Sequence, residues 1–454
     1  MHYVNIFCAA LLCLLSAGVQ AVTLSELRRS ALENDLSFRA AGKVHEAEQA
    51  EAAAGKSHLL PSAGLSYQNT PHNRLTQRAP VTDQRRYRSH SLNLVVTQPL
   101  FDYTAYHQYR TAQIRGTAAE SRLQIQQAEL MNRLVSAYLN LACALETEKT
   151  DRLRLELNTS QLTAAQRLLQ LGEGTVTEVE SARTRLHQRQ AQIAETEAES
   201  LNALLILSDL TGLPHLRIQD IPSLKPGNFR LPQLKDDNYA AQEQKMLTVH
   251  PEIKAAQYET ALSKAAAEVQ RGAFMPSAQL FAAWSDTQSD SNDTVGQRYR
   301  NLSAGIHLSV PLFSGGKDLA GMRKASAQIQ QAQYEQDALV QTLRRDLARQ
   351  YQAFRRSGVQ LAALEQAAAA ARLQVTAAEK GYAAGQNSQP DVANARDQYY
   401  QAEQELTKAR YDGLLSWFRL HYYSSTPETA LFRQIEDYFT VTERMPHCQP
   451  GSAC

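Results

Sequence analysis

The 454-residue sequence has little of what marks membrane-spanning helices, disulfide-stabilised domains or nucleic-acid-binding proteins. After its first 21 residues, no segment has the roughly 18–20 consecutive apolar residues that a helix needs to cross a bilayer. Any crossing of a membrane by the mature chain would therefore be made by strands of a closed barrel. Only five cysteines are present, two of them in that first segment, so the core does not depend on disulfides. The formal net charge of +1 gives no support for nucleic-acid binding, which favours a clustered basic face.

The sequence also lacks the motifs of common catalytic and metal sites. It contains no Gly-x-Ser-x-Gly, no Walker loop, no His-Glu-x-x-His and no Cys-x-x-Cys. Its histidines do not recur at the spacing of metal ligands. The segment Gly315–Lys317 has the Gly-Gly-Lys of a phosphate loop without the rest, and we interpret it as a turn. We therefore expect no enzymatic activity, no metal and no cofactor.

The two ends of the chain are interpreted as a targeting segment and an appendage. Residues 1–21 contain a short apolar run that ends in Val19-Gln20-Ala21, which is typical of a cleaved secretory signal peptide. The run is too short for a membrane-spanning helix. Residues 426–454 are expected to form a C-terminal appendage, in which Cys448 and Cys454 could pair in an oxidising compartment.

What the sequence does contain is a tandem duplication. The segment Leu168–Arg183 (LLQLGEGTVTEVESAR) matches Gly381–Arg396 (GYAAGQNSQPDVANAR) at a constant offset of 213 residues. In each copy a helical pattern breaks at glycine and restarts with an acid in the new first turn, which predicts a helical hairpin made twice. We expect a first repeat over 22–213, a linker over 214–240 that carries four prolines, and a second repeat over 241–425.

Long helices dominate both expected repeats. Helices over Tyr103–Leu171 and Lys317–Tyr382 would each be on the order of 100 Å long. Shorter return helices over Val176–Thr211 and Pro390–Tyr423 would run back antiparallel. A narrow, alanine-rich heptad stripe indicates coiled-coil packing, which requires partner helices: Leu130, Leu134, Ala137, Leu141 and Ala144. A further helix is expected over Thr23–Leu60, with Ser25 as its N-cap.

The sequence of each repeat also predicts two strands joined by a polar loop. The strands are expected at 62–69 and 89–97, and again at 277–284 and 301–309, with loops over Thr70–Arg88 and Asp286–Gln297. In the last strand the apolar set alternates with a polar set: Leu302, Ala304, Ile306 and Leu308 against Ser303, Gly305, His307 and Ser309. Barrel strands around a wet lumen and soluble sheets over a core both alternate in this way. Four strands are too few to close a barrel, so a barrel would need several protomers.

Together these features resemble the TolC-type outer-membrane channel and efflux proteins. The resemblance rests on Leu60-Pro61 and Met275-Pro276 before the strands, Thr97–Phe101 and Val310–Phe313 after them, and the two hairpins that end in Ala-Arg. It implies a mainly α protein with a small β part that forms a homotrimer. Each protomer would give four strands to a shared twelve-stranded outer-membrane β-barrel and its helices to a periplasmic α-helical tunnel, while the two polar loops would face outside the cell.

The resemblance also implies a function. The trimer would be a passive exit duct in the outer membrane of a Gram-negative bacterium, with most of the chain in the periplasm. It would dock to a periplasmic adaptor and to an inner-membrane ABC or proton-driven transporter. The cargo stays open between proteins of type I secretion and small toxic compounds, and the pattern leans slightly towards proteins. The alternative from a different class is a soluble periplasmic coiled-coil adaptor or scaffold.

The resemblance places a gate at the hairpin turns. Its first acid and its tyrosine match Asp391 and Tyr382, whereas its second acid and its arginine fall on Asn394 and Asn387. Three Asp391 carboxylates around an axis would attract cations, and with Asn394 there is one acidic ring fewer, which predicts weaker cation block. In the first hairpin the acid falls on Glu178. Without the resemblance, Asp391 and Glu178 are simply first-turn acids that the helix dipole favours.

The same resemblance assigns the outermost turn residues to partner binding. The residues expected to contact the adaptor at the two tips are Gly172, Gly174, Gly385 and Gln386.

Overall fold

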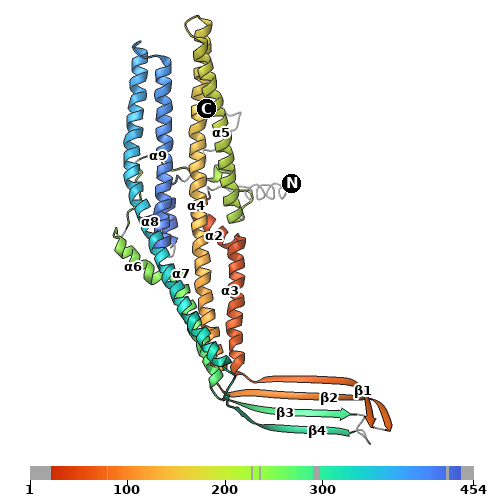
Figure 1. Ribbon diagram of the computed structural model, residues 1–454. Coiled ribbons are helices and arrows are strands. Elements are labelled where there is room, and N and C mark those ends of the chain that lie inside the picture. Colours follow the sequence, from red (N-terminus) through yellow and green to blue (C-terminus); the bar gives the residue numbers. More distant parts are fainter. Residues whose placement is uncertain are drawn as a thin grey trace, which may run out of the picture. The chain divides into compact units, whose positions relative to one another are not determined.

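The computed structural model describes residues 22–78, 80–225, 227, 229–234, 237–289, 297–425 and 429–440. The expected signal peptide, Cys448 and Cys454 lie outside these residues. The described chain is mainly helical with one four-stranded sheet, which confirms the predicted fold class (Figure 1). It divides into two compact units. The sheet unit takes residues 42–123 and 251–341, and the hairpin unit takes the described residues up to 41, 124–250 and from 342 onward.

Both long helices and both return helices form as the sequence predicted. The helices are α2 (Leu24–Asn34), α3 (Leu36–Ala54), α4 (Tyr103–Gln170), α5 (Val176–Thr211), α6 (Tyr239–Val249), α7 (Pro251–Arg271), α8 (Lys317–Ala383), α9 (Gln389–Ser424) and α10 (Thr429–Glu436). Short 3₁₀ turns occupy Gly55–Leu59, Ile218–Asp220 and Gly272–Phe274. Within the described part of the chain, no helix combines the length and apolar character needed to cross a membrane.

The first helical region differs from the prediction at its start and in its middle. The N-cap is Thr23 rather than Ser25, because Thr23 and Glu26 form a reciprocal capping box. The region then breaks at Asp35, which is buried. The Asp35 carboxylate accepts a hydrogen bond from the backbone N–H of Phe38 at 2.7 Å and so begins a second helix, α3.

The predicted loop over Thr70–Arg88 is wrong. The strands β1 (Ser62–Arg78) and β2 (Val81–Asp102) continue through it as one long hairpin. Two prolines and a polar composition suggested a loop, but Pro71 lies on β1, an edge strand of the sheet, where a missing N–H is tolerated. Pro80 lies in the turn itself. The other predicted strands extend as β3 (Ser277–Ser289) and β4 (Gln297–Ser309). The predicted loop over Asp286–Gln297 is therefore wrong at both ends, and its residues 290–296 lie outside the described residues.

The sheet has one apolar face and one mainly polar face, which also carries Val95 and Phe281. Its order is β1-β2-β3-β4, antiparallel throughout. The register aligns one apolar row across all four strands: Leu65, Leu94, Trp284 and Leu302. The next row, on the opposite face, is polar: Ser66, Asn93, Ser285 and Asn301. Because Leu65 and Leu302 are 68% and 76% exposed, the described residues leave the apolar face uncovered.

The hairpin unit holds the main hydrophobic core. The predicted stripe of α4 is buried there at Leu130, Leu134 and Leu141, against large residues of α9 such as Trp417 and Phe418. The C-terminal segment belongs to this core, since α10 buries Phe432 and Ile435 completely. The Phe432 ring lies 5.9 Å from the Phe418 ring and 5.4 Å from the Arg28 guanidinium of α2. Residues 429–440 therefore stabilise the hairpin unit rather than trailing from it.

We expect Phe432→Ala to lower the free energy of unfolding by about 3–5 kcal/mol, because it leaves a cavity in a closed core. The exposed neighbour in the same helix, Gln434→Ala, should change it by less than about 0.5 kcal/mol. Denaturant unfolding followed by circular dichroism measures both. Equal effects of the two substitutions would contradict a structural role for α10.

A second stability prediction concerns His250, which is 2% exposed between α6 and α7. Burial lowers the pKa of His250 from 6.5 to about 4. Between these values the unfolded chain binds a proton that the folded chain does not, so stability present above pH 6.5 is lost as the pH falls towards 4. We expect a loss of about 2 kcal/mol from pH 7 to pH 5. His250→Gln should remove that part of the pH dependence; identical pH profiles for the two proteins would refute it.

Candidate gate and docking site at the hairpin tips

The two hairpin tips are the same backbone turn made twice. Gly172 and Gly385 have φ values of +74° and +72°, in the left-handed region that favours glycine. The N–H of Glu173 donates to the Leu168 carbonyl at 3.0 Å, and 213 residues later the N–H of Gln386 donates to the Gly381 carbonyl at 2.8 Å. The repeat read from the sequence is therefore present at the level of individual hydrogen bonds.

The return helices start with matching capping boxes. Glu178 accepts from the Thr175 N–H at 2.8 Å, and Asp391 accepts from the Ser388 N–H at 2.8 Å. The Asp391 carboxylate also accepts a hydrogen bond from the Ser388 hydroxyl. This hydrogen bond has the larger effect and the one from the Ser388 N–H the smaller, and together they hold the pKa of the exposed Asp391 carboxyl below its usual value. The structure thus places each predicted gate acid at the exposed start of a helix, bonded within its own hairpin.

The remaining predicted gate residues lie close to the second tip. Tyr382 is half exposed near the end of α8. The Asn387 amide donates to the Ala378 carbonyl at 3.3 Å and covers Gly381, where an added Cβ would lie 2.4 Å from the amide nitrogen. Asn387 therefore closes the end of α8. In the first tip the position equivalent to Asn387 is Gly174, where a Cβ would lie only 3.0 Å from the Leu169 backbone nitrogen.

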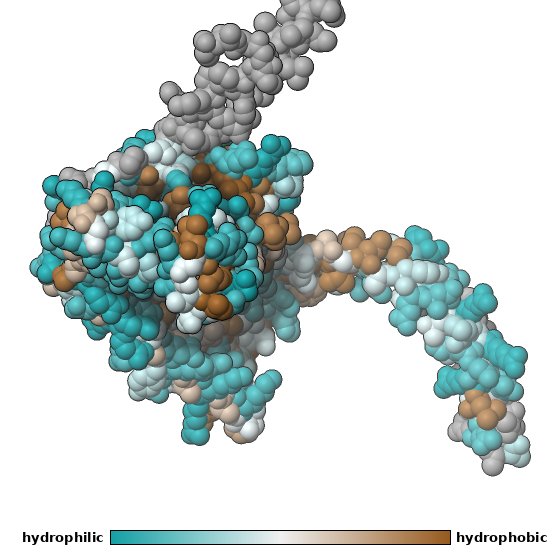
Figure 2. Space-filling model, turned by 90° about the horizontal axis from the view of Figure 1, so that it is seen from above, coloured by the Kyte–Doolittle hydropathy of each residue, from teal (hydrophilic) through white to brown (hydrophobic). Residues whose placement is uncertain are grey.

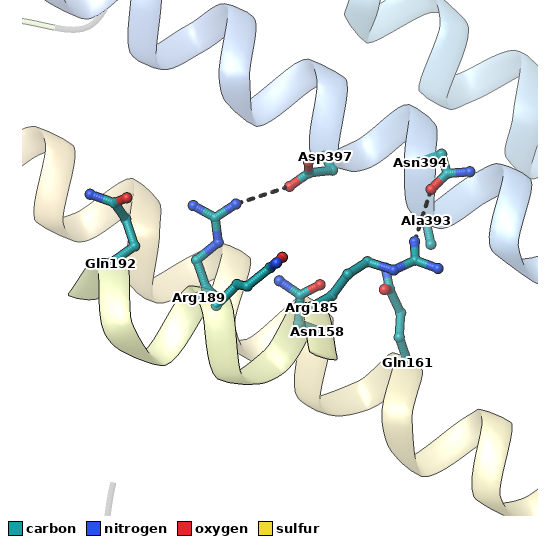
Figure 3. A pocket seen from close by; sticks show the side chains of 9 residues that line it. Asn158, Gln161, Arg185, Arg189, Gln192, Ala393, Asn394 and Asp397 are labelled. Atoms are coloured by element: carbon teal, nitrogen blue, oxygen red, sulfur yellow. Dashed lines mark hydrogen bonds and ion pairs between the residues drawn. The ribbon is translucent and has the colours of Figure 1, made fainter. Parts of the chain in front are cut away.

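Asn394 joins the second hairpin to the first. Its side-chain oxygen accepts a hydrogen bond from Arg185 of α5 at 3.2 Å (Figure 3). Arg185 was not among the residues singled out from the sequence. The two departures from the acidic and basic gate pattern, Asn387 and Asn394, thus have structural partners of their own.

A partly buried set of charges, which we call the hairpin ion cluster, was also missed. It comprises Asp151 and Arg154 of α4, Arg189 of α5 and Asp397 of α9. Arg154 lies 2.8 Å from Asp397, and Arg189 lies 3.2 Å from Asp151 and 3.7 Å from Asp397. Asp151 is 1% exposed, and Arg154 is 6% exposed. Burial, and then the neighbouring Arg154, lower the pKa of Arg189, while both aspartates oppose that shift.

A polar cavity of about 250 Å³ lies beside the cluster (Figure 3). Its lining includes Asn158, Gln161, Gln192, Arg185 and Asp397. Among the described residues, neither the Asp151 Oδ2 nor the Arg189 Nε atom has a hydrogen-bond partner, although both atoms are buried. A cavity of this size and polarity suits ordered water, which would satisfy such atoms.

The sequence did carry a signal for this cluster. Continued at seven-residue spacing from Leu130, the heptad stripe of α4 passes through Ala137 and Ala144 and then reaches Asp151 and Asn158. Polar residues at the apolar position of a coiled coil need buried polar partners. The identity of those partners was hidden, because Arg189 and Asp397 come from helices far along the chain.

Comparison with known proteins identifies the class of protein. The structure superposes on the outer-membrane channel OprN with a TM-score of 0.74 at 21% sequence identity, covering 89% of this chain and 90% of that one. At this identity the likeness establishes the fold. The chain therefore has the same fold as that outer-membrane channel.

Sequence comparison gives the family. A model described as outer membrane efflux protein matches residues 27–213 and 244–423. The alkaline protease secretion protein AprF of Pseudomonas aeruginosa is 32% identical over 425 residues, which cover 93% of this chain and 88% of AprF. The outer membrane protein TolC of Vibrio cholerae is 23% identical over 418 residues, which cover 91% of this chain and 93% of TolC. The chain belongs to the outer membrane efflux protein family, and the predicted family, outer-membrane location and transport role are confirmed.

Loss of the buried pair in the hairpin ion cluster should be costly. We expect Arg154→Gln to lower the free energy of unfolding by about 3 kcal/mol, because it leaves Asp151 buried with fewer partners. The matched control is Arg152→Gln on the same helix, whose exposed side chain pairs with Glu148 and Glu197 and should contribute less than about 1 kcal/mol. Denaturant unfolding of both variants tests this difference. A smaller effect at Arg154 than at Arg152 would contradict it.

Proposed function

We propose that three copies of this chain form a channel-tunnel that spans the outer membrane and the periplasm. The observation that carries the proposal is the sheet. Among the residues that the structure describes, its strands β1 and β4 each pair on one side only, and its apolar face is exposed. Pairing of β4 in one protomer with β1 in the next would satisfy both edges and close a twelve-stranded barrel. The apolar face would then contact lipid, and the polar face would line the lumen.

The long helices support the same assembly. Along α8, large apolar side chains are more than 70% exposed: Tyr334, Val359 and Leu373. Exposed apolar residues on α5 include Leu201, Leu205 and Ile206. Isolated apolar residues on a surface are ordinary, but several along a coiled-coil helix fit packing against a neighbouring helix. Helices of adjacent protomers would cover them and form the wall of the tunnel.

The hairpin tips would form the gate and the docking surface. Three copies of Asp391, together with Tyr382, Asn387, Asn394 and Glu178, would surround the periplasmic opening. The acidic ring would attract cations, and the asparagine at 394 leaves one acidic ring where the related pattern has two. The exposed turns at Gly172, Gly174, Gly385 and Gln386 would receive a periplasmic adaptor and an inner-membrane transporter.

The similarity to AprF favours proteins as cargo. AprF is described as an alkaline protease secretion protein, and it is similar to this chain over nearly its whole length. We therefore favour type I secretion of a protein over efflux of small compounds. The duct itself would carry out no chemical reaction, and the transporter would supply the energy. The alternative, a soluble periplasmic adaptor, would leave the exposed apolar face of the sheet in water; recovery of the chain only as a soluble periplasmic monomer would favour it.

Replacement of the gate acid tests the proposal. In planar bilayers we expect the purified trimer to give stable, low, cation-preferring conductance. Asp391→Asn should reduce the cation-to-anion permeability ratio by roughly tenfold, because the ring loses its fixed charges. Glu173→Gln removes an exposed tip acid that lies outside either capping box, and it should leave the ratio nearly unchanged.

The possible results separate the parts of the proposal. A trimeric channel whose selectivity does not respond to Asp391→Asn would keep the duct and remove Asp391 from the constriction. Folded protein that forms neither trimers nor channels would reject the duct itself.

A further inference from the structure

The apolar face of the sheet ends abruptly along the strands. On β4 the apolar residues run at every second position from Leu308 to Leu302, and the next residue on that face is Arg300. Eight residues separate Leu308 from Arg300, about 27 Å along a strand. With a tilt of about 40° this is somewhat over 20 Å, close to the apolar band of outer-membrane barrels. Figure 2 shows hydrophobic residues gathered towards one end of the projecting strands and hydrophilic ones towards the other.

Beyond that boundary the same face carries four arginines, which we call the arginine row: Arg86, Arg88, Arg298 and Arg300. The register fixes their side of the sheet. Arg86 and Arg88 lie an even number of residues from Leu94 on β2, and Arg298 and Arg300 lie an even number from Leu302 on β4. All four are exposed. The row therefore points the same way as the apolar band. Arg300 lies at the first level beyond the band and Arg298 at the next, whereas Arg88 and Arg86 lie further out, beyond His90 on β2.

One carboxylate partly neutralises the row. Asp286 accepts hydrogen bonds from Arg298 Nε at 2.8 Å and from Arg300 Nε at 3.1 Å. Among the strand residues whose side chains the structure describes, it is the one acid on this face. Four guanidinium groups against one carboxylate leave this group of residues with a formal charge of +3. The Arg298 and Arg300 side chains stay 53% and 64% exposed despite this pairing, so both keep surface for another ligand.

Aromatic residues mark the same boundary. Tyr67 shares a row across the sheet with Asp286 and Arg300, and Trp284 lies in the adjacent apolar row. Tyr67 is 65% exposed. Tyrosine and tryptophan favour the level of lipid headgroups, because one end of each ring is apolar and the other polar. The arginine row thus begins at the level where headgroups are expected.

We propose that the arginine row binds the phosphate groups of lipids in the outer leaflet of the outer membrane. The inference rests on the proposed function, which sets the sheet in that membrane with its hairpin ends outward. Guanidinium groups present a planar fork that matches phosphate oxygens in pairs. A ligand at this position must hold its anionic group directly above its acyl chains, because the row and the apolar band share one face. That requirement favours a phosphate-bearing lipid over a nucleic acid or an acidic peptide.

The test uses the full mature protein as a trimer in non-ionic detergent. Native mass spectrometry would count bound lipid during titration with diphosphoryl lipid A and with the same lipid after removal of its phosphates. We expect the phosphorylated form to bind at least about tenfold more tightly. Arg86→Gln combined with Arg88→Gln should weaken its binding by roughly 30-fold. Arg88→Gln alone should have a smaller effect in the same direction.

The matched control is Arg74→Gln, which removes one exposed arginine from the opposite face of the same hairpin. It should change lipid binding by less than about twofold. Equal affinity for the two lipid forms, or unchanged binding by the double variant, would overturn the proposal. Complete displacement of the lipid by millimolar inorganic phosphate would also overturn it, because the site would then recognise a free anion rather than a lipid headgroup.

Conductance in bilayers of pure phosphatidylcholine separates this inference from the proposed function. Channels formed equally by wild type and the double variant, together with no preference for phosphorylated lipid, would reject the arginine row alone. Wild-type protein that forms no channel at all would reject the duct, and the lipid site would fail with it.

Discussion

Hydrogen bonding at the edges of the sheet is the constraint on which the rest of the structure depends. In the described part of the chain β2 and β3 have neighbours on both sides, whereas β1 and β4 have a neighbour on one side only. A β-strand edge left open exposes a row of donors and acceptors, and in a lipid environment each unpaired group costs several kcal/mol. The open edges therefore support the proposed assembly of several protomers, in which β4 of one would pair with β1 of the next. The exposed apolar residues of α5 and α8 point to the same conclusion from the helical side.

The two hairpins show how a duplicated sequence can keep a backbone and change its chemistry. Gly172 and Gly385 occupy the same left-handed turn, and Thr175–Glu178 and Ser388–Asp391 form the same capping box. These elements depend only on local residues, so duplication preserved them together. The packing between the hairpins did not stay symmetric. Arg189 and Asp397 have Ala402 and Thr184 at the equivalent positions, so the ion cluster can form only once in each chain.

The same distinction explains what could be predicted from the sequence. The long helices, their return partners and the tips follow from periodicity and capping, which are local. The alternation of Leu302, Ile306 and Leu308 with polar residues predicts β4 and its two faces. The lengths of β1 and β2 could not be predicted in this way. Pairing along the ladder outweighed the loop propensity of residues 70–88, including Pro71. In the candidate site, the turn residues could be predicted from the sequence. The contacts of Asn394 and Asp151 could not, because their partners lie on other helices.

The residues buried along α9 and beside it grade from large to small towards the tip. Near the C-terminal end of α9 the buried residues include Trp417 and Phe418. Closer to the tip they are Leu361, Ala368, Leu406 and Ala409. Next to the turn they are Ala378, Val392 and Ala395. Buried area, and with it the cost of separating α9 from its neighbours, falls in the same order. Between the large core and the tip, the first hairpin is attached to α9 by charges that desolvation makes costly to bury. The firm attachment therefore lies at the core, and the end that the proposed gate requires to move is the end held by the smallest side chains.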